Sequence, residues 1–248
     1  MLQSQFHPLK TNASTGELYL PLEYHPNIIL TTPRLSDIPK LPDLLNDPGV
    51  CIWLRGPPFP YEIEHSEEWV TKLVEETEEI LQELKDAEGN DTLKLVGGSP
   101  VRCIREIKED GTDVLIGDIH LRRCETMELA PGIKNNSESW EDSPKLLGLA
   151  NMRRENGDPE ILWSVGYFLA TSHSGQGIMT SAFKAILEQW AIPRMGIRRM
   201  IGETYAENYG SQRVLEKNGF VFREIVKEHL EAKGKKHDIC VFDLNVSL

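Results

Sequence analysis

The alternation of hydrophobic and polar positions predicts a mixture of strands and helices in the first hundred residues. The apolar run at 28–31 is typical of a short strand, and the segment 36–47 carries a helical pattern with Ser36 as its expected N-cap. A loop rich in glycine and proline follows at 56–60. Residues 62–85 then combine an apolar stripe with an acidic face, which predicts a long amphipathic helix.

From residue 100 onward the hydrophobic period shortens to two, which favours strands. Residues 101–107 and 114–121 alternate around the turn sequence KEDGTD and predict a β-hairpin. Residues 123–160 are polar and have no sustained period, so we expect a polar loop insertion there. The nearly continuous apolar run 161–170 predicts a strand that is covered on both faces.

The remainder of the chain predicts two helices and three strands. A helix follows the run 161–170 and extends to about residue 191, and a strand is expected at 198–206. A short helix then ends at Gly219, which is suited to a left-handed C-cap. Residues 222–246 predict a final hairpin that turns at Lys233–Lys235.

The composition limits the domain count and the class of partner. The chain has 248 residues, with 27 Lys and Arg against 39 Asp and Glu, and a formal net charge of −12. This balance argues against a nucleic-acid binder, which needs a basic surface, and it suits either a cationic substrate or ordinary solvated charge. No repeat or linker is evident, so we expect one α/β domain at 28–248 behind an N-terminal arm at 1–27.

Cysteine spacing and hydropathy bear on the compartment. The four cysteines are scattered, with no CxxC pair and no histidines at metal spacing, which predicts reduced thiols and no metal site. Neither a signal peptide nor an apolar run of membrane-spanning length is found. We therefore expect a cytoplasmic protein without a membrane contact, of unknown oligomeric state.

Two glycines stand between the predicted strand 161–170 and the helix behind it, in the sequence SGQGIMT. The first N–H groups of a helix have no intrahelical acceptors, and the helix dipole favours an anion there. Because Gly175 and Gly177 have no side chain to keep a phosphate away, the turn is either a phosphate cradle or a plain turn. A Walker loop is excluded because no Lys-Ser or Lys-Thr follows, and a dinucleotide fingerprint fails because Thr180 replaces its third glycine.

A second motif, N-x-x-S-x-x-V-L-E-K-x-G-F, follows the next predicted strand at 208–220. With the strand, glycine turn, helix and strand before it, the segment 155–245 resembles the GNAT superfamily of acyl-CoA-dependent N-acyltransferases. The branch named for the ribosomal-protein alanine N-acetyltransferases is the most similar, and residues 32–50 resemble its opening segment. The resemblance implies an α+β fold with a central, mostly antiparallel sheet of splayed strands between helices, and acetyl-CoA as co-substrate.

The resemblance also implies which residues hold acetyl-CoA. The family's pyrophosphate loop, Q/R-x-x-G-x-G/A, aligns with 174–179, where Ser174 replaces the usual Arg or Gln and Met179 replaces a small residue. We expect the first change to weaken phosphate binding and the second to crowd the helix start. The pantetheine arm of acetyl-CoA is expected to pair with the strand backbone at 168–169, as an added strand would. The expected cofactor contacts are Phe168, Leu169, Ser174, Gly175, Gln176, Gly177, Ile178, Met179, Thr180, Asn208 and Ser211.

The catalytic residues are less well defined, because the chain departs from the family at two positions. Leu215 stands where many members have a proton-donating tyrosine, and Ser164 stands where relatives often have an acidic residue. Ser211 is the nearest hydroxyl and either protonates the departing sulfur or caps its helix. Glu203 is a substitute base or a solvated surface residue. The candidate catalytic residues are Ser211, Glu203 and Ser164.

Three further groups complete the candidates. Asp118 and His120 alternate with apolar residues on the predicted hairpin and could face either side of a sheet. His173 stands beside the glycine turn, where it could touch phosphate but would be a poor base. Backbone N–H groups near 165–168 are expected donors to the oxyanion.

Two functions from different classes remain open. The first is an acetyl-CoA-dependent N-acetyltransferase that moves an acetyl group to a primary amine, on a small molecule or peptide, by direct attack in a ternary complex. The alternative is a non-catalytic acyl-CoA-binding sensor or scaffold, which the missing tyrosine and altered loop favour. A purely structural α/β domain would have no affinity for the cofactor. Release of coenzyme A in the presence of amines distinguishes the first from the others.

Overall fold

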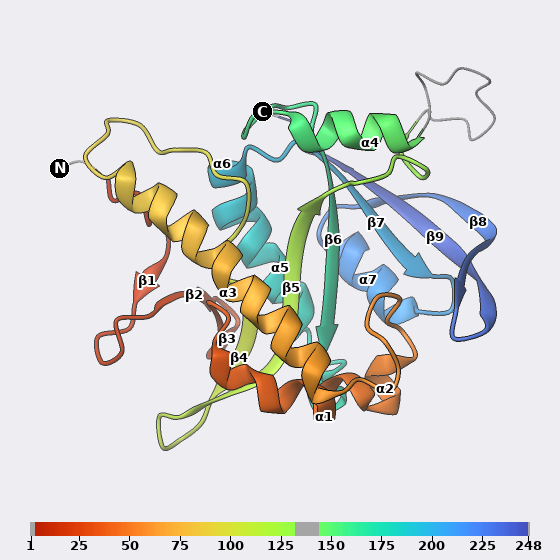
Figure 1. Ribbon diagram of the computed structural model, residues 1–248, viewed down its shortest axis with the longest axis horizontal. Helices are drawn as coiled ribbons and strands as arrows, with labels where there is room; N and C mark the ends of the chain where they lie inside the picture. The colour runs from red at the N-terminus through yellow and green to blue at the C-terminus, as the bar shows by residue number, and fades with distance from the viewer. Residues whose placement is uncertain (1–2, 132–143, 248) are drawn as a thin grey trace. The chain divides into compact units, whose positions relative to one another are not determined.

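A computed structural model describes residues 3–131 and 144–247 of the chain. The chain divides into two compact units. The units comprise Met1–His120 with Tyr167–Arg194, and Leu121–Gly166 with Met195–Leu248. Strands β5 (Asp113–Arg123) and β6 (Leu162–Leu169) run through both units (Figure 1). The single domain expected at 28–248 stays a prediction.

The first unit contains antiparallel strands and most of the helices. Its strands follow the order β1-β2-β3-β4-β5, with Ile29 opposite Arg105 and Leu30 opposite Ile104. Its other elements, with the strands, are β1 (Lys10–Thr11), β2 (Leu18–Leu22), β3 (His25–Thr31), η1 (Leu35–Lys40), α1 (Leu41–Asn46), α2 (Pro48–Cys51), α3 (Ile63–Asp86), β4 (Cys103–Ile107), η3 (Thr171–His173), α5 (Ile178–Ile186), the π-helical η4 (Leu187–Ala191) and α6 (Ile192–Met195), which ends at the boundary. The predicted strand at 28–31, the helix at 62–85 and the hairpin at 101–121 are confirmed.

Helices cover both faces of the sheet in the first unit. Figure 1 shows α3 crossing in front of these strands, and α5 lies behind them, packed against β2 and β3. The cluster of buried residues on the α3 side comprises Leu41, Leu45, Val50, Tyr61, Val70, Cys103 and Leu115. The segment 1–27, expected as an arm, contains β1, β2 and the start of β3. β2 pairs antiparallel with β3, and its side chains at Leu20 and Leu22 are buried.

The helix expected at 36–47 is divided in two, and Ser36 is not its N-cap. Arg34 is the N-cap of the 3-10 helix η1, and its backbone N–H donates to the Asp37 carboxylate at 2.9 Å. Pro39 lies inside η1 and has no N–H to donate, which interrupts regular α-helical bonding. The prediction was wrong because a carboxylate held in the protein interior caps the helix in place of the expected serine.

The second unit combines the remaining strands with two helices. Its elements besides the shared strands are α4 (Pro144–Arg153), β7 (Arg199–Tyr205), α7 (Tyr209–Lys217), β8 (Val221–Ala232) and β9 (Lys235–Asn245). β6 runs parallel to β7, with Leu162 opposite Arg199, whereas β7, β9 and β8 are antiparallel neighbours. The predicted strand at 198–206, the helix ending at Gly219 and the final hairpin are confirmed. The mixed fold with a mostly antiparallel sheet is also confirmed.

A polar loop was expected at 123–160, but residues 144–153 form helix α4, so the prediction is wrong there. Residues 132–143 of the expected loop lie outside the described part of the chain. Asn151 explains why this polar sequence is ordered. Its buried side chain donates to the carbonyl oxygens of Cys124 and Leu162, at 3.0 and 2.8 Å, and accepts from the N–H of Leu162 at 2.8 Å. Three hydrogen bonds from one side chain therefore tie α4 to the ends of β5 and β6, which periodicity cannot reveal.

Gly148 brings α4 close to the chain that follows β5, and it gives a test of this packing. A Cβ at position 148 would lie 1.9 Å from the carbonyl oxygen of Glu125 and 2.9 Å from the Cα of Thr126. Gly148→Ala should therefore lower the free energy of unfolding by about 2 kcal/mol or more, as overpacking does, although alanine is normally favoured in a helix. Urea unfolding measured by circular dichroism checks this.

Gly210→Ala is the matched control, because a Cβ there meets only Asn208 Oδ1 at 3.6 Å, an ordinary contact. This variant should be neutral or more stable, by at most about 1 kcal/mol. Equal stability of the two variants would contradict the close packing of α4.

Candidate functional site

The glycine turn adopts the backbone that only glycine takes easily. Gly175 and Gly177 have φ angles of 77° and 80°, in the left-handed region. A Cβ at Gly175 would meet nothing within 4 Å, and one at Gly177 would meet only the His25 Nε2, at 3.9 Å. The turn is therefore open on the side where these side chains would project.

The first turn of α5 is not capped by a side chain. Gly177 is its N-cap, and a glycine has no side chain that could accept from the amides behind it. Helix α7 differs, because the Oδ1 of its N-cap Asn208 accepts the N–H of Ser211 at 3.0 Å. Orphan amides at a helix start need an acceptor from outside the helix. The N-cap residue supplies such an acceptor for α7 but not for α5, and the open glycine turn in front of α5 fits an anion such as a pyrophosphate.

The other side chains of the turn are held by local contacts or buried. Ser174 Oγ donates to the Ala170 carbonyl oxygen at 3.4 Å, and Gln176 Nε2 donates to the Ser172 carbonyl oxygen at 3.0 Å. Ile178 and Met179 are buried with the core face of α5. Met179 therefore packs in the protein interior, and the expectation that it crowds the helix start stays a prediction.

Two histidines lie near the turn, and their contacts differ. His173 is engaged at both ring nitrogens, with Ser172 Oγ 2.9 Å from Nδ1 and Glu106 Oε2 3.3 Å from Nε2. His25, at the start of β3, directs its Nε2 toward Gly177. Sequence reasoning missed His25, because about 150 residues separate it from the turn and no motif links them.

The end of β6 carries the two residues expected beside the pantetheine arm. Ala170 N–H donates to the Ile116 carbonyl oxygen at 2.7 Å, so β6 lies next to β5 here. A Cβ on Gly117 would lie 2.5 Å from the Phe168 carbonyl oxygen and 3.1 Å from the Leu169 side chain. The glycine at 117 therefore permits the close approach of the two strands, and the expected pairing of Phe168 and Leu169 with a cofactor stays a prediction.

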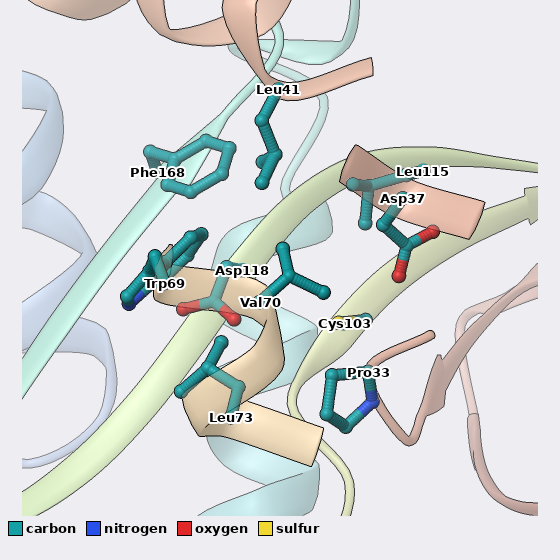
Figure 2. A pocket seen from close by; sticks show the side chains of 10 residues that line it. All are labelled: Pro33, Asp37, Leu41, Trp69, Val70, Leu73, Cys103, Leu115, Asp118 and Phe168. Carbon is teal, nitrogen blue, oxygen red and sulfur yellow. The ribbon is translucent and has the colours of Figure 1, made fainter. Parts of the chain in front are cut away.

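A small cavity in the first unit adjoins this end of β6 (Figure 2). Its empty volume is about 250 Å³, part of it open to solvent. The lining residues are Pro33, Asp37, Leu41, Trp69, Val70, Leu73, Cys103, Leu115, Asp118 and Phe168. The wall is apolar apart from two carboxylates, and each of these is paired with an arginine.

Arg102 and Arg105 neutralise the two carboxylates of the cavity. Arg102 binds Asp118 with two hydrogen bonds, of 2.7 and 2.8 Å, and its guanidinium lies 5.6 Å from the centre of the Trp69 ring. Arg105 donates to Asp37 at 2.6 Å. Although burial opposes the charged form of Asp118, the charge and hydrogen bonds of Arg102 lower its pKa from 3.8 to about 2. The Asp118 carboxylate in the cavity is therefore ionised, and each of the two carboxylates is paired with an arginine.

The lowered pKa of Asp118 predicts how stability depends on pH. A carboxyl whose pKa is lower in the folded state stabilises the protein above its unfolded pKa, and this is lost as the pH falls through the folded pKa. Asp118 should contribute about 2 kcal/mol above pH 3.8, which disappears as the pH falls toward 2. The free energy of unfolding should therefore fall less between pH 5 and pH 2 in Asp118→Asn than in the wild type. Equal losses in the two proteins would contradict the assignment.

The candidate catalytic residues of the second unit have local partners. Ser164 Oγ donates to the Arg122 carbonyl oxygen at 3.4 Å. Glu203 is exposed on β7, and burial of the Cys124 thiol, with a smaller contribution from the Glu203 charge, raises the pKa of Cys124 to about 12. Leu215, at the position of the family tyrosine, is buried against Gly202, whose Cβ would lie 2.7 Å from the leucine side chain. These placements leave the roles of Ser164, Glu203 and Ser211 as predictions.

All four cysteines of the chain lie in its described part, are buried and form no disulfide. Burial also raises the pKa of Cys103 and Cys240. No group of three His, Cys, Asp or Glu residues within 3–131 and 144–247 could hold a metal ion. No helix in the same ranges is long and apolar enough to cross a membrane.

Comparisons with known proteins agree with this geometry. Residues 128–221 match the model of the acetyltransferase (GNAT) domain family. The probable N-acetyltransferase YjcK of Bacillus subtilis is 35% identical over 74 residues, and this match spans 30% of the chain and 40% of that relative. The chain therefore aligns with less than half of the curated relative.

Solved structures extend the likeness to the whole fold. A GNAT-family acetyltransferase from Bacillus anthracis has a TM-score of 0.58 at 13% identity, covering 92% of this chain and 98% of its own. RimL, the ribosomal L7/L12 alpha-N-protein acetyltransferase, in complex with coenzyme A, has a TM-score of 0.58 at 16% identity, with the same coverages. These define the fold class, which is the GNAT acetyltransferase fold. The match of residues 128–221 to the GNAT family model agrees with the resemblance that the sequence predicts.

Proposed function

We propose that the protein is an acetyl-CoA-dependent N-acetyltransferase with a primary amine as acceptor. The observation that carries the proposal is the open turn of two left-handed glycines at the start of α5, whose N-cap residue Gly177 has no capping side chain. Coenzyme A presents a pyrophosphate, and the amides of such a turn bind phosphate without any charged side chain. The GNAT domain match and the coenzyme A bound to the structural neighbour RimL support the same cofactor.

The chain's residues would act mainly by binding and positioning. The amides behind Gly175 and Gly177 would hold the pyrophosphate, and the imidazole of His25 would lie beside it as a hydrogen-bond donor. The backbone of Phe168 and Leu169 would hold the arm. Bound acetyl-CoA supplies the activated acetyl group as a thioester. The acceptor must give up a proton, since an ammonium with a pKa near ~10 has no lone pair for attack.

Titration calorimetry of the protein with acetyl-CoA, and then with 3′-dephospho-CoA, tests the cofactor assignment. We expect micromolar binding of acetyl-CoA. Binding of 3′-dephospho-CoA with similar affinity would attribute recognition to the pyrophosphate and the arm. A lack of heat at millimolar acetyl-CoA would contradict the proposal and favour a structural domain.

Release of coenzyme A from acetyl-CoA tests turnover and separates the enzyme from the alternative, a non-catalytic sensor or scaffold. Suitable acceptors are a peptide with a free α-amine, spermidine, glucosamine and benzylamine, because the sequence leaves all four amine classes open. Coenzyme A and the acetylated amine, separated by chromatography, should appear in equal amounts with at least one acceptor. Tight binding of acetyl-CoA without either product for any amine would favour the sensor.

A further inference from the structure

Asp118 and His120 form a hydrogen-bonded pair on β5 that no part of the proposed cofactor site uses. His120 Nδ1 lies 3.1 Å from Asp118 Oδ1. The two residues are two positions apart on a strand, so their side chains lie on the same face of it. Asp118 lines the cavity in Figure 2, so His120 continues the same face of β5 beyond it.

The contacts of Asp118 determine which nitrogen of His120 carries the proton. Arg102 holds the carboxylate in its ionised form through two hydrogen bonds. An ionised carboxylate only accepts hydrogen bonds, so the nitrogen facing it must be Nδ1–H. In the neutral imidazole the Nε2 atom is then the one with a lone pair. The pair therefore has the arrangement of a histidine base oriented by a carboxylate.

Exposure divides the pair into an inner and an outer member. The Asp118 side chain is 4% exposed, whereas the His120 side chain is 30% exposed. A buried carboxylate cannot reach an acceptor amine, but a partly exposed imidazole can. The carboxylate is thus suited to positioning and the imidazole to proton transfer.

The strand pairing places His120 in the direction that the cofactor arm would take. Ile116 bonds Ala170, and Cys124 bonds Leu162, so β5 and β6 run in opposite directions. An arm that starts at the glycine turn and passes Leu169 and Phe168 therefore moves along β5 from Ile116 toward Asp118 and His120. The reactive end of such an arm lies farther from the turn than its pyrophosphate.

We propose that His120 is the general base that deprotonates the acceptor amine, and that Asp118 positions it; this rests on the proposed function. His120 Nε2 takes one proton from the ammonium. The freed nitrogen lone pair forms a C–N bond with the acetyl carbonyl carbon, and the C–S bond breaks. The departing thiolate takes the second proton of the amine, and His120 releases its proton to water. The products are the acetylated amine, coenzyme A and one proton.

Two substitutions of His120 distinguish a base from a structural hydrogen-bond donor. His120→Asn retains an N–H donor near the position of Nδ1 and removes Nε2, whereas His120→Gln retains a nitrogen near Nε2. We expect both to lower kcat/KM for the most active amine of the panel by about 100-fold or more, as loss of a general base does. The dissociation constant for acetyl-CoA and the melting temperature of each variant should match those of the wild type.

Imidazole added to His120→Ala should restore part of the activity, and long-range ¹H–¹⁵N spectra provide a readout apart from activity. In the free wild-type protein the spectra should show His120 protonated at Nδ1 and unprotonated at Nε2. Asp118→Asn should abolish this tautomer preference. The proposal would be overturned if the wild type is active and His120→Asn is equally active. It would also be overturned if the spectra show Nδ1 of His120 without a proton. A wild type without turnover would instead refute the proposed function, and this inference with it.

Discussion

Replacement of Gly177 by leucine should raise the dissociation constant for acetyl-CoA at least about 100-fold. Gly177 has a φ of 80°, where a leucine costs about 1–2 kcal/mol, and the strain is relieved only if the turn moves. Such movement displaces the first amides of α5 from the phosphate. Loss of two charge-assisted hydrogen bonds, at roughly 1.5 kcal/mol each, corresponds to a change of about 100-fold. Calorimetric titration with acetyl-CoA measures it.

Gly111→Leu is the matched control for this variant. Gly111 has a φ of 82° in the turn between β4 and β5, and a Cβ there would meet nothing within 4 Å, whereas one at Gly177 would meet only the His25 Nε2 at 3.9 Å. The two variants should lose similar stability, but only Gly177→Leu should lose affinity for acetyl-CoA. Wild-type affinity in Gly177→Leu would show that the glycine turn is a plain turn, with the cofactor bound elsewhere or not at all.

Replacement of Arg105 by methionine should lower the free energy of unfolding by about 3–5 kcal/mol. Arg105 is buried on β4 and donates to Asp37 at 2.6 Å and to Thr31 Oγ1 at 2.7 Å. Methionine fills much of the space but leaves the buried Asp37 carboxylate without its cation, and such unpaired charges are costly. Urea unfolding at neutral pH should show the loss as a lower midpoint.

Two further variants identify the unpaired charge as the cause. Adding Asp37→Asn to Arg105→Met removes the charge while keeping an oxygen that accepts from the Arg34 N–H, so part of the stability should return. Arg154→Met breaks an ion pair with Asp158 near the surface and should cost less than about 1 kcal/mol. If Arg105→Met were no worse than Arg154→Met, the buried pair would not support the first unit.

The strands and the long helix follow from the sequence because burial imposes a period on it. The alternation at 101–121 identifies the hairpin β4–β5, and the continuous apolar run at 161–170 identifies β6. Helix α4 was missed because its order depends on one polar residue, Asn151, whose three hydrogen bonds reach backbone groups 11 and 27 positions away. Contacts of that kind leave no periodic signal.

The candidate site likewise has one part that the sequence predicts and another that it could not predict. The glycine turn is local, and its left-handed residues could be predicted because only glycine adopts that backbone readily. The Asp118–His120 pair was considered, but its orientation could not be decided from alternation alone. Arg102 settles it, and Arg102 lies 16 positions away on a different segment. His25 beside Gly177 is more distant still, so only a three-dimensional arrangement brings it to the turn.

The burial of Cys51, Cys103, Cys124 and Cys240 shields their thiols, so the native protein should react only slowly with a thiol-specific dye. Burial also raises the pKa of Cys103, Cys124 and Cys240, which leaves less of the reactive thiolate. Such a dye would report only the coenzyme A that is released, so acetyl transfer could be followed continuously in the protein's presence. Without substrate, the slow appearance of four reactive thiols per chain would instead count unfolding events. The same reagent would therefore measure catalysis on one timescale and kinetic stability on another.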